Sequence, residues 1–169
     1  KETAYTFTMK KEIPHTPVKS QDRTGTCWCF STVSFMESEA MRLGAGELDL
    51  SEMFLVRYTY SKKADNYIRL HGKANFSQGA LNHDAMEQFA EYGIAPEQVY
   101  SGKQFEEDIH NHSEIVSVFS NMLDGVLAAR RPSIKWREAF NAAADVYFGT
   151  PPETFSYNGK TYTPKEFAD

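Results

Sequence analysis

One cysteine near the start of a predicted helix is placed for nucleophilic chemistry. Cys27 follows a turn that contains Gly25, and it falls in the first helical turn. Unpaired backbone N–H groups and the helix dipole stabilise negative charge at this position, which favours the thiolate, the attacking form of cysteine. We therefore predict that Cys27 is a reactive thiol.

The residues around Cys27 suit acyl transfer. Gln21 stands six residues upstream, and its side-chain amide can fold back beside the Cys27 backbone N–H to bind an oxyanion. Gly25 would permit unusual backbone angles and the close approach of a substrate backbone. Trp28 is bulky enough to shield the site from water. The residue types therefore predict Cys27 as nucleophile, Gln21 as oxyanion donor and Trp28 next to the substrate.

Helical periodicity and end signals predict the elements that position this site. Cys29 lies on an apolar stripe of the first helix, so it is predicted to be a core residue rather than a second reactive thiol. The same reasoning gives the third helix a buried face of Ala85, Met86, Phe89 and Ala90. The stripe of the first helix is Cys29, Val33, Met36, Ala40 and Leu43, and the predicted helices cover residues 26–43, 51–70, 81–92, 104–130 (one helix or two) and 132–148.

Two short β-elements are also predicted. Residues 5–9 read as a strand, and residues 154–163 read as a hairpin because Asn158-Gly159 suits a type I′ turn. Thr163-Pro164 then resembles the N-cap and first position of another helix. Because this helix has hardly begun where the sequence stops, we expect the protein to continue.

Composition narrows the class of protein. The chain has 169 residues, a net charge of −5, 41% hydrophobic residues and no clustered basic run, which disfavours a nucleic-acid surface. No apolar run reaches the roughly 18–20 residues that span a bilayer, so a membrane partner is not expected. The two cysteines are two positions apart on a helix and cannot readily pair, so no internal disulfide framework is expected.

The motif around Cys27 resembles that of the papain-like cysteine peptidases. Their pattern is a glutamine, five residues, then Cys-Trp-x-Phe-[Ser/Ala], and here it reads Gln21 followed by Cys27-Trp28-Cys29-Phe30-Ser31. Thr24 replaces a cysteine that forms a disulfide in the secreted branch. This departure, together with residues 123–130, 150–155 and 163–167, resembles the bleomycin hydrolase and bacterial aminopeptidase C branch, which carries a long insertion.

The resemblance implies an α+β papain-like cysteine proteinase fold. Residues 1–100 would form the helical half with the nucleophile, and residues 101–169 would form a helical and hairpin insertion. Gly79-Ala80 resembles the Gly-Gly edge that lines the cleft and pairs with the substrate backbone, with Ala80 in place of the second glycine. The β-rich half that holds the catalytic histidine and asparagine is expected outside this chain, in further sequence or in a second chain.

The implied activity is that of a cysteine-type aminopeptidase. It would hydrolyse peptide substrates through a thioester acyl-enzyme and would need no cofactor. The family resemblance also implies a C-terminal arm that restricts the enzyme to free N-termini, a homo-hexamer and a cytoplasmic location. Export would fit instead if a signal peptide had preceded Lys1.

Other interpretations of the same residues stay open. Cys27 could be a structural thiol, Cys27 and Cys29 could form a redox or metal Cys-x-Cys pair, and the chain could be a non-catalytic papain-like module for binding or assembly. His83 is a weak candidate for the general base, with a surface histidine as the default. His110 and His112 do not share a helix face, so no metal site is predicted.

Overall fold

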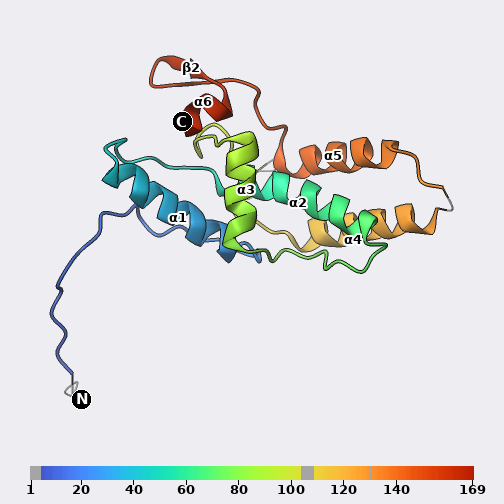
Figure 1. Cartoon of the computed structure of the whole chain (residues 1–169), viewed down its shortest axis with the longest axis horizontal. Coiled ribbons are helices and arrows are strands. Elements are labelled where there is room, and N and C mark those ends of the chain that lie inside the picture. Colours follow the sequence, from blue (N-terminus) through green and yellow to red (C-terminus); the bar gives the residue numbers. More distant parts are fainter. Residues whose placement is uncertain (1–4, 104–108, 130) are drawn as a thin grey trace.

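The computed structural model describes residues 5–103, 109–129 and 131–169, which form a set of packed helices with a small hairpin (Figure 1). Helix α2 lies at the centre and contacts α1, α3, α4 and α5. The elements are α1 (Cys27–Arg42), α2 (Glu52–Arg69), α3 (Asn82–Tyr92), α4 (Ser113–Ala128), α5 (Lys135–Phe148), β1 (Phe155–Tyr157), β2 (Lys160–Tyr162) and α6 (Pro164–Ala168).

Local signals explain where most helices begin and end. The Ser51 hydroxyl caps α2 by accepting a hydrogen bond from the Phe54 N–H at 3.0 Å. Gly44 follows the end of α1 with a φ of 89°, a left-handed conformation that favours glycine. These predicted ends are confirmed. Among the described residues, no helix is long and apolar enough to cross a bilayer.

The core is aromatic and is centred on α2. All residues of α2 from Met53 to Val56 are buried, because neighbouring helices cover it from several directions. Phe119, Phe140 and Phe148 are also fully buried, and they join α4 and α5 to α2. The predicted insertion therefore packs on the same core as the N-terminal helices.

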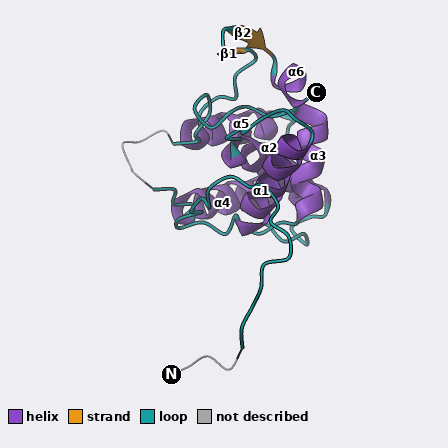
Figure 2. Cartoon of the chain, turned by 90° about the vertical axis from the view of Figure 1, so that its left-hand side faces the viewer, coloured by secondary structure: helices purple, strands orange, loops and turns teal. Residues whose placement is uncertain are grey.

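The hairpin is confirmed at its predicted position. Asn158 and Gly159 have φ values of 50° and 77°, as a type I′ turn requires, and β1 pairs antiparallel with β2. Rings of both strands pack edge-on against Phe167 of α6. The hairpin and α6 lie together above the helices in Figure 2, and Ile94 joins them to the end of α3 by donating to the Pro164 carbonyl at 3.0 Å.

Several sequence predictions of structure were wrong. Residues 5–9 form no strand: they are exposed, and a lone strand has no partner to complete its hydrogen bonds. Leu43 is 73% exposed, and Glu37 is buried on α1 instead. In α3, Met86 and Ala90 are exposed, whereas Gln88 is buried.

Within the predicted insertion, α4 covers Ser113–Ala128, and α5 begins at Lys135 rather than at Pro132. The predicted acidic start at residues 104–108 and Arg130 lie outside the described residues.

Candidate active site

Cys27 is the first residue of α1, and its side chain is exposed. The Thr26 carbonyl accepts hydrogen bonds from the Cys29 N–H at 2.8 Å and from the Phe30 N–H at 3.1 Å. In the described part of the chain no acceptor takes the Cys27 N–H, which leaves this donor available to an oxyanion. The predicted position of the thiol at an accessible helix N-terminus is confirmed.

Cys29 has the opposite environment. Its side chain is completely buried, and its Sγ donates to the Glu52 carbonyl at 3.3 Å. Burial raises the pKa of the Cys29 thiol well above its usual value, so the thiol stays protonated. Both cysteines are free thiols, and the prediction that Cys29 is a core residue is confirmed.

Gln21 folds back onto the loop that precedes α1. Its Nε2 donates to the Thr24 carbonyl at 2.5 Å, and the Thr24 hydroxyl donates to the Gln21 carbonyl at 2.7 Å. A primary amide has two N–H groups, and the second makes no hydrogen bond to any described residue. The loop therefore holds the amide close to the chain segment that leads into Cys27.

Gln78 joins this loop to the segment predicted to line the cleft. Its side-chain oxygen accepts from the Gly25 N–H at 2.6 Å, and its carbonyl accepts from Trp28 Nε1 at 3.1 Å. A Cβ on Gly25 would lie 3.0 Å from the Gln78 Cβ, so a larger residue here would require Gln78 to shift by a few tenths of an ångström. The φ of Gly25 does not lie in the left-handed region that favours glycine.

Gly79 and Ala80 directly follow Gln78. Gly79 is exposed and a Cβ there would meet no atom within 4 Å, whereas Ala80 is half-buried. The Gly79 carbonyl accepts from Lys63 Nζ at 2.5 Å. Through Gln78, the structure connects this predicted substrate edge to both Gly25 and Trp28.

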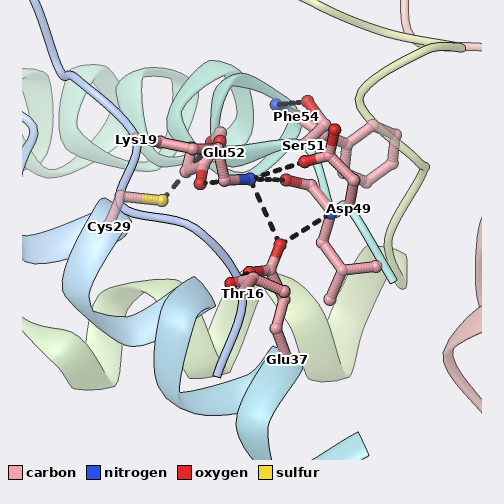
Figure 3. Close-up of polar contacts among 9 residues, drawn as sticks. Thr16, Lys19, Cys29, Glu37, Asp49, Ser51, Glu52 and Phe54 are labelled. Atoms are coloured by element: carbon pink, nitrogen blue, oxygen red, sulfur yellow. Dashed lines mark hydrogen bonds and ion pairs between the residues drawn. The ribbon is translucent and has the colours of Figure 1, made fainter. Parts of the chain in front are cut away.

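Before Gln21 in the chain, the Lys19 side chain inserts into a group of carboxylates (Figure 3). Its Nζ lies 3.1 Å from Glu37 Oε1, 2.8 Å from Asp49 Oδ1 and 2.8 Å from Glu52 Oε1. The Thr16 hydroxyl also donates to Glu37. These contacts fasten the segment that leads to Gln21 onto α1 and onto the start of α2.

Charge and burial shift several pKa values in this cluster. Burial would lower the pKa of Lys19, but the Glu52 carboxylate and the hydrogen bond to Asp49 raise it above its usual value. Burial raises the pKa of Glu52, an effect that Lys19 opposes. Glu97 lies nearby, and its pKa is raised to about 7, mainly by burial and to a smaller extent by repulsion from Glu52.

A second segment borders the Gln21 loop. The Arg23 N–H donates to the His110 carbonyl at 3.0 Å, and the His112 N–H donates to the Arg23 carbonyl at 3.3 Å. The His110 N–H donates to Asp22 Oδ2 at 3.0 Å, and this hydrogen bond lowers the pKa of the Asp22 carboxyl. The Gln21 loop is therefore held by Lys19 on one side and by residues 110–112 on the other.

The remaining predicted candidates lie apart from this arrangement. The His83 side chain is 63% exposed, and its nearest acidic contact is Asp84 at 3.8 Å. Across the ranges that the structure describes, no three histidine, cysteine or acidic side chains are grouped to hold a metal ion.

Sequence reasoning missed three parts of the site: the Lys19 cluster, Gln78 and the contact with residues 110–112. A signal existed for the first, because Glu37 falls on the Cys29–Val33 side of α1, where an acidic residue needs a buried partner.

Comparisons with known proteins identify the family and the fold of this chain. The family described as papain family cysteine protease matches residues 4–145. The solved structure of PepW from Lactobacillus rhamnosis HN001 is similar, with a TM-score of 0.69 and 17% identity. The match covers 96% of this chain and 45% of the PepW chain, so this chain spans less than half of that protein.

A search of curated proteins found no match. The predicted fold class is nevertheless confirmed by the family match and by the structural likeness to PepW. The exposed helix-start thiol of Cys27, with the folded Gln21 loop before it, lies inside the matched region. The chain therefore belongs to the papain family of cysteine proteases.

Proposed function

We propose that the chain supplies the nucleophile and the oxyanion donors of a cysteine aminopeptidase. The observation that carries this proposal is the exposed Cys27 thiol at the first position of α1, with the Gln21 amide folded onto the loop before it. The unpaired N–H groups of the helix N-terminus lie at the Cys27 position, and the buried Trp28 that follows donates from its Nε1 to the Gln78 carbonyl at 3.1 Å.

In this mechanism the Cys27 sulfur attacks the carbonyl carbon of the peptide bond. The Cys27 N–H and the free N–H of Gln21 bind the oxyanion that forms. A histidine from outside the chain takes the thiol proton and returns it to the leaving amine, which leaves a thioester on Cys27. Water then hydrolyses the thioester and releases the acid.

Specificity for free N-termini rests on resemblance to the bleomycin hydrolase and aminopeptidase C branch. The residues that carry this resemblance are 123–130, 150–155 and 163–167, and they include the end of α4, the segment that leads into β1, and most of α6. Gly79 and Ala80 would pair with the substrate backbone. We also propose that further sequence or a second chain provides the histidine and asparagine, and that the assembly is a cytoplasmic homo-hexamer.

The nucleophile is tested by Cys27→Ala in the complete protein. Turnover of an aminoacyl substrate should fall by at least about 10³-fold, because the covalent step is lost. Cys29→Ala is the matched control and should retain turnover, since this thiol is buried away from the substrate. Undiminished activity of Cys27→Ala would overturn the assignment.

Two further measurements test the alternatives. The first distinguishes an enzyme from a non-catalytic module, and the second distinguishes an aminopeptidase from an endopeptidase. An epoxysuccinyl thiol reagent should label only Cys27, whereas absence of labelling and of turnover would favour the module. Acetylation of the substrate N-terminus should abolish turnover by an aminopeptidase. Equal turnover of free and acetylated peptides would exclude that specificity.

A further inference from the structure

We propose that residues 110–112 hold the loop of residues 21–24 in position, and that Asp22 is the positioning residue through which they act. This inference rests on the proposed role of Gln21 as an oxyanion donor. Asp22 is the neighbour of Gln21, and neither Asp22 nor residues 110–112 would touch the substrate. Their effect on turnover would come from where they hold the Gln21 amide.

Three hydrogen bonds join the two segments, and they involve Asp22 and Arg23 on one side and His110 and His112 on the other. Two are the backbone bonds of Arg23 to His110 and His112, at 3.0 Å and 3.3 Å, which make a short parallel bridge opposite Asn111. The third runs from the His110 N–H to Asp22 Oδ2 at 3.0 Å. This third bond ends on a carboxylate, and hydrogen bonds to charged groups are generally stronger than those between neutral groups.

Residues 110–112 are themselves fixed to the helical core. His112 is 2% exposed, and its ring lies edge-on to Phe148 of α5, with 5.1 Å between the ring centroids. The Tyr60 hydroxyl of α2 lies 3.5 Å from His112 Nδ1. The His112 carbonyl accepts from the Val116 N–H in the first turn of α4. The segment is therefore a rigid support rather than a free loop.

The conformation of the loop links the position of residues 110–112 to the position of the Gln21 amide. Asp22 has a φ of 54°, a left-handed conformation that costs a non-glycine residue energy and needs outside contacts to persist. Beside it, Gln21 and Thr24 close the loop through their two mutual hydrogen bonds. If Asp22 changed conformation, Gln21 would turn with it, and the amide would leave its position.

The test compares three substitutions of Asp22 in the complete enzyme. Asp22→Gly removes the carboxylate but tolerates the positive φ, and Asp22→Asn keeps an acceptor oxygen and also tolerates it. Asp22→Ala removes the acceptor and disfavours the φ. We expect kcat to fall about 10- to 100-fold in the glycine and alanine variants, because a donor shifted by about 1 Å is largely lost. Asparagine should restore most of kcat, and KM should change little.

The rate of Cys27 alkylation by iodoacetamide distinguishes positioning from general damage. Alkylation forms no oxyanion, so its rate should stay within about twofold in all three variants while turnover falls in two of them. Equal, near-normal kcat in the glycine and asparagine variants would overturn the inference, and so would parallel losses of alkylation and turnover. Failure of the proposed function would instead appear as an active Cys27→Ala enzyme.

Discussion

The Lys19 ammonium is surrounded by the carboxylates of Glu37, Asp49 and Glu52. Glu37 is completely buried, and Glu52 nearly so, and their charges are tolerated because this cation is present. Lys19→Met would leave buried carboxylates without a cation and should lower the free energy of unfolding by about 3 kcal/mol. A urea titration of the complete protein would measure the loss.

A lysine in a surface ion pair offers the matched control. Lys135 pairs with Glu138 on the exposed side of α5, so Lys135→Met should change the free energy of unfolding by less than about 0.5 kcal/mol. The double variant Lys19→Met with Glu52→Gln should recover part of the stability lost in Lys19→Met. Similar decreases in the free energy of unfolding for Lys19→Met and Lys135→Met would show that the buried cluster stabilises the protein no more than a surface ion pair does.

Glu97 makes stability depend on pH. Its pKa is about 7 in the folded protein, and its ordinary value lies near 4.5. Between these values the folded state holds a proton that the unfolded state has lost, so this residue's contribution to stability falls as pH rises from about 5 to 8. Glu97→Gln removes the effect. The variant should be about as stable as the original at pH 5, and more stable at pH 8 by on the order of 1 kcal/mol, allowing for solvent screening.

Thermal unfolding of both proteins at several pH values would check this difference. The exposed Glu153→Gln serves as control, and its stability should follow the original protein across the whole range. If Glu97→Gln also followed the original protein, the carboxyl would titrate at an ordinary pH.

At the residue scale, the sequence predicted what depends on neighbours along the chain. The helix-start position of Cys27 and the core position of Cys29 follow from local spacing. The Lys19 cluster and the Gln78 contacts join residues that lie 18 to 53 positions apart, so a local pattern can mark Glu37 as buried but cannot identify its partner. Long-range polar contacts of this kind were therefore missed.

At the scale of elements, two glycines show how the ends of helices control packing. Gly93 ends α3 with a φ of 80°, and a Cβ there would overlap the Pro164 carbonyl of α6. Gly44 follows α1 with a φ of 89°, but a Cβ there would meet no atom within 4 Å. Both substitutions carry left-handed strain, and only one also forces two elements apart.

Gly93→Ala should therefore destabilise the protein by about 3 kcal/mol or more, and Gly44→Ala by only about 1–2 kcal/mol. Chemical denaturation would give both values. Hydrogen exchange at the Ile94 N–H, which donates to the Pro164 carbonyl, should speed up in Gly93→Ala and not in Gly44→Ala. Equal losses in both variants would mean that the contact of α3 with α6 adds no stability.

The elements were predicted best where their signals are local. Ser51, Gly44, Gly93 and the Asn158-Gly159 turn all mark ends that the structure confirms. The strand at residues 5–9 was wrong, and the predicted face of α3 was only partly right: Ala85 is buried and Phe89 packs against the core, but Met86 and Ala90 are exposed. Both predictions depend on what lies opposite these residues in space. In α3 it is Gln88, not Met86 or Ala90, that turns into the protein.

At the scale of the whole molecule, the family match ends at residue 145, and this chain covers 45% of the PepW chain. The division predicted at residue 100 stays a proposal. Helices on both sides of it share one core, since α2 contacts α4 and α5 as well as α1 and α3. In this arrangement the helices after residue 100 pack against the half that carries the nucleophile and contribute to its core.

The contrast between Cys27 and Cys29 also allows the rate of local unfolding to be measured by thiol alkylation. The two thiols are two positions apart on one helix, but only one is accessible, and the other reacts only when α1 separates from the Glu52 carbonyl. In pulse alkylation of the complete protein, one thiol should therefore react at once, and the second at the rate set by opening of the helix pair. Urea should accelerate only the second, and equally fast reaction of both in native buffer would contradict the burial of Cys29.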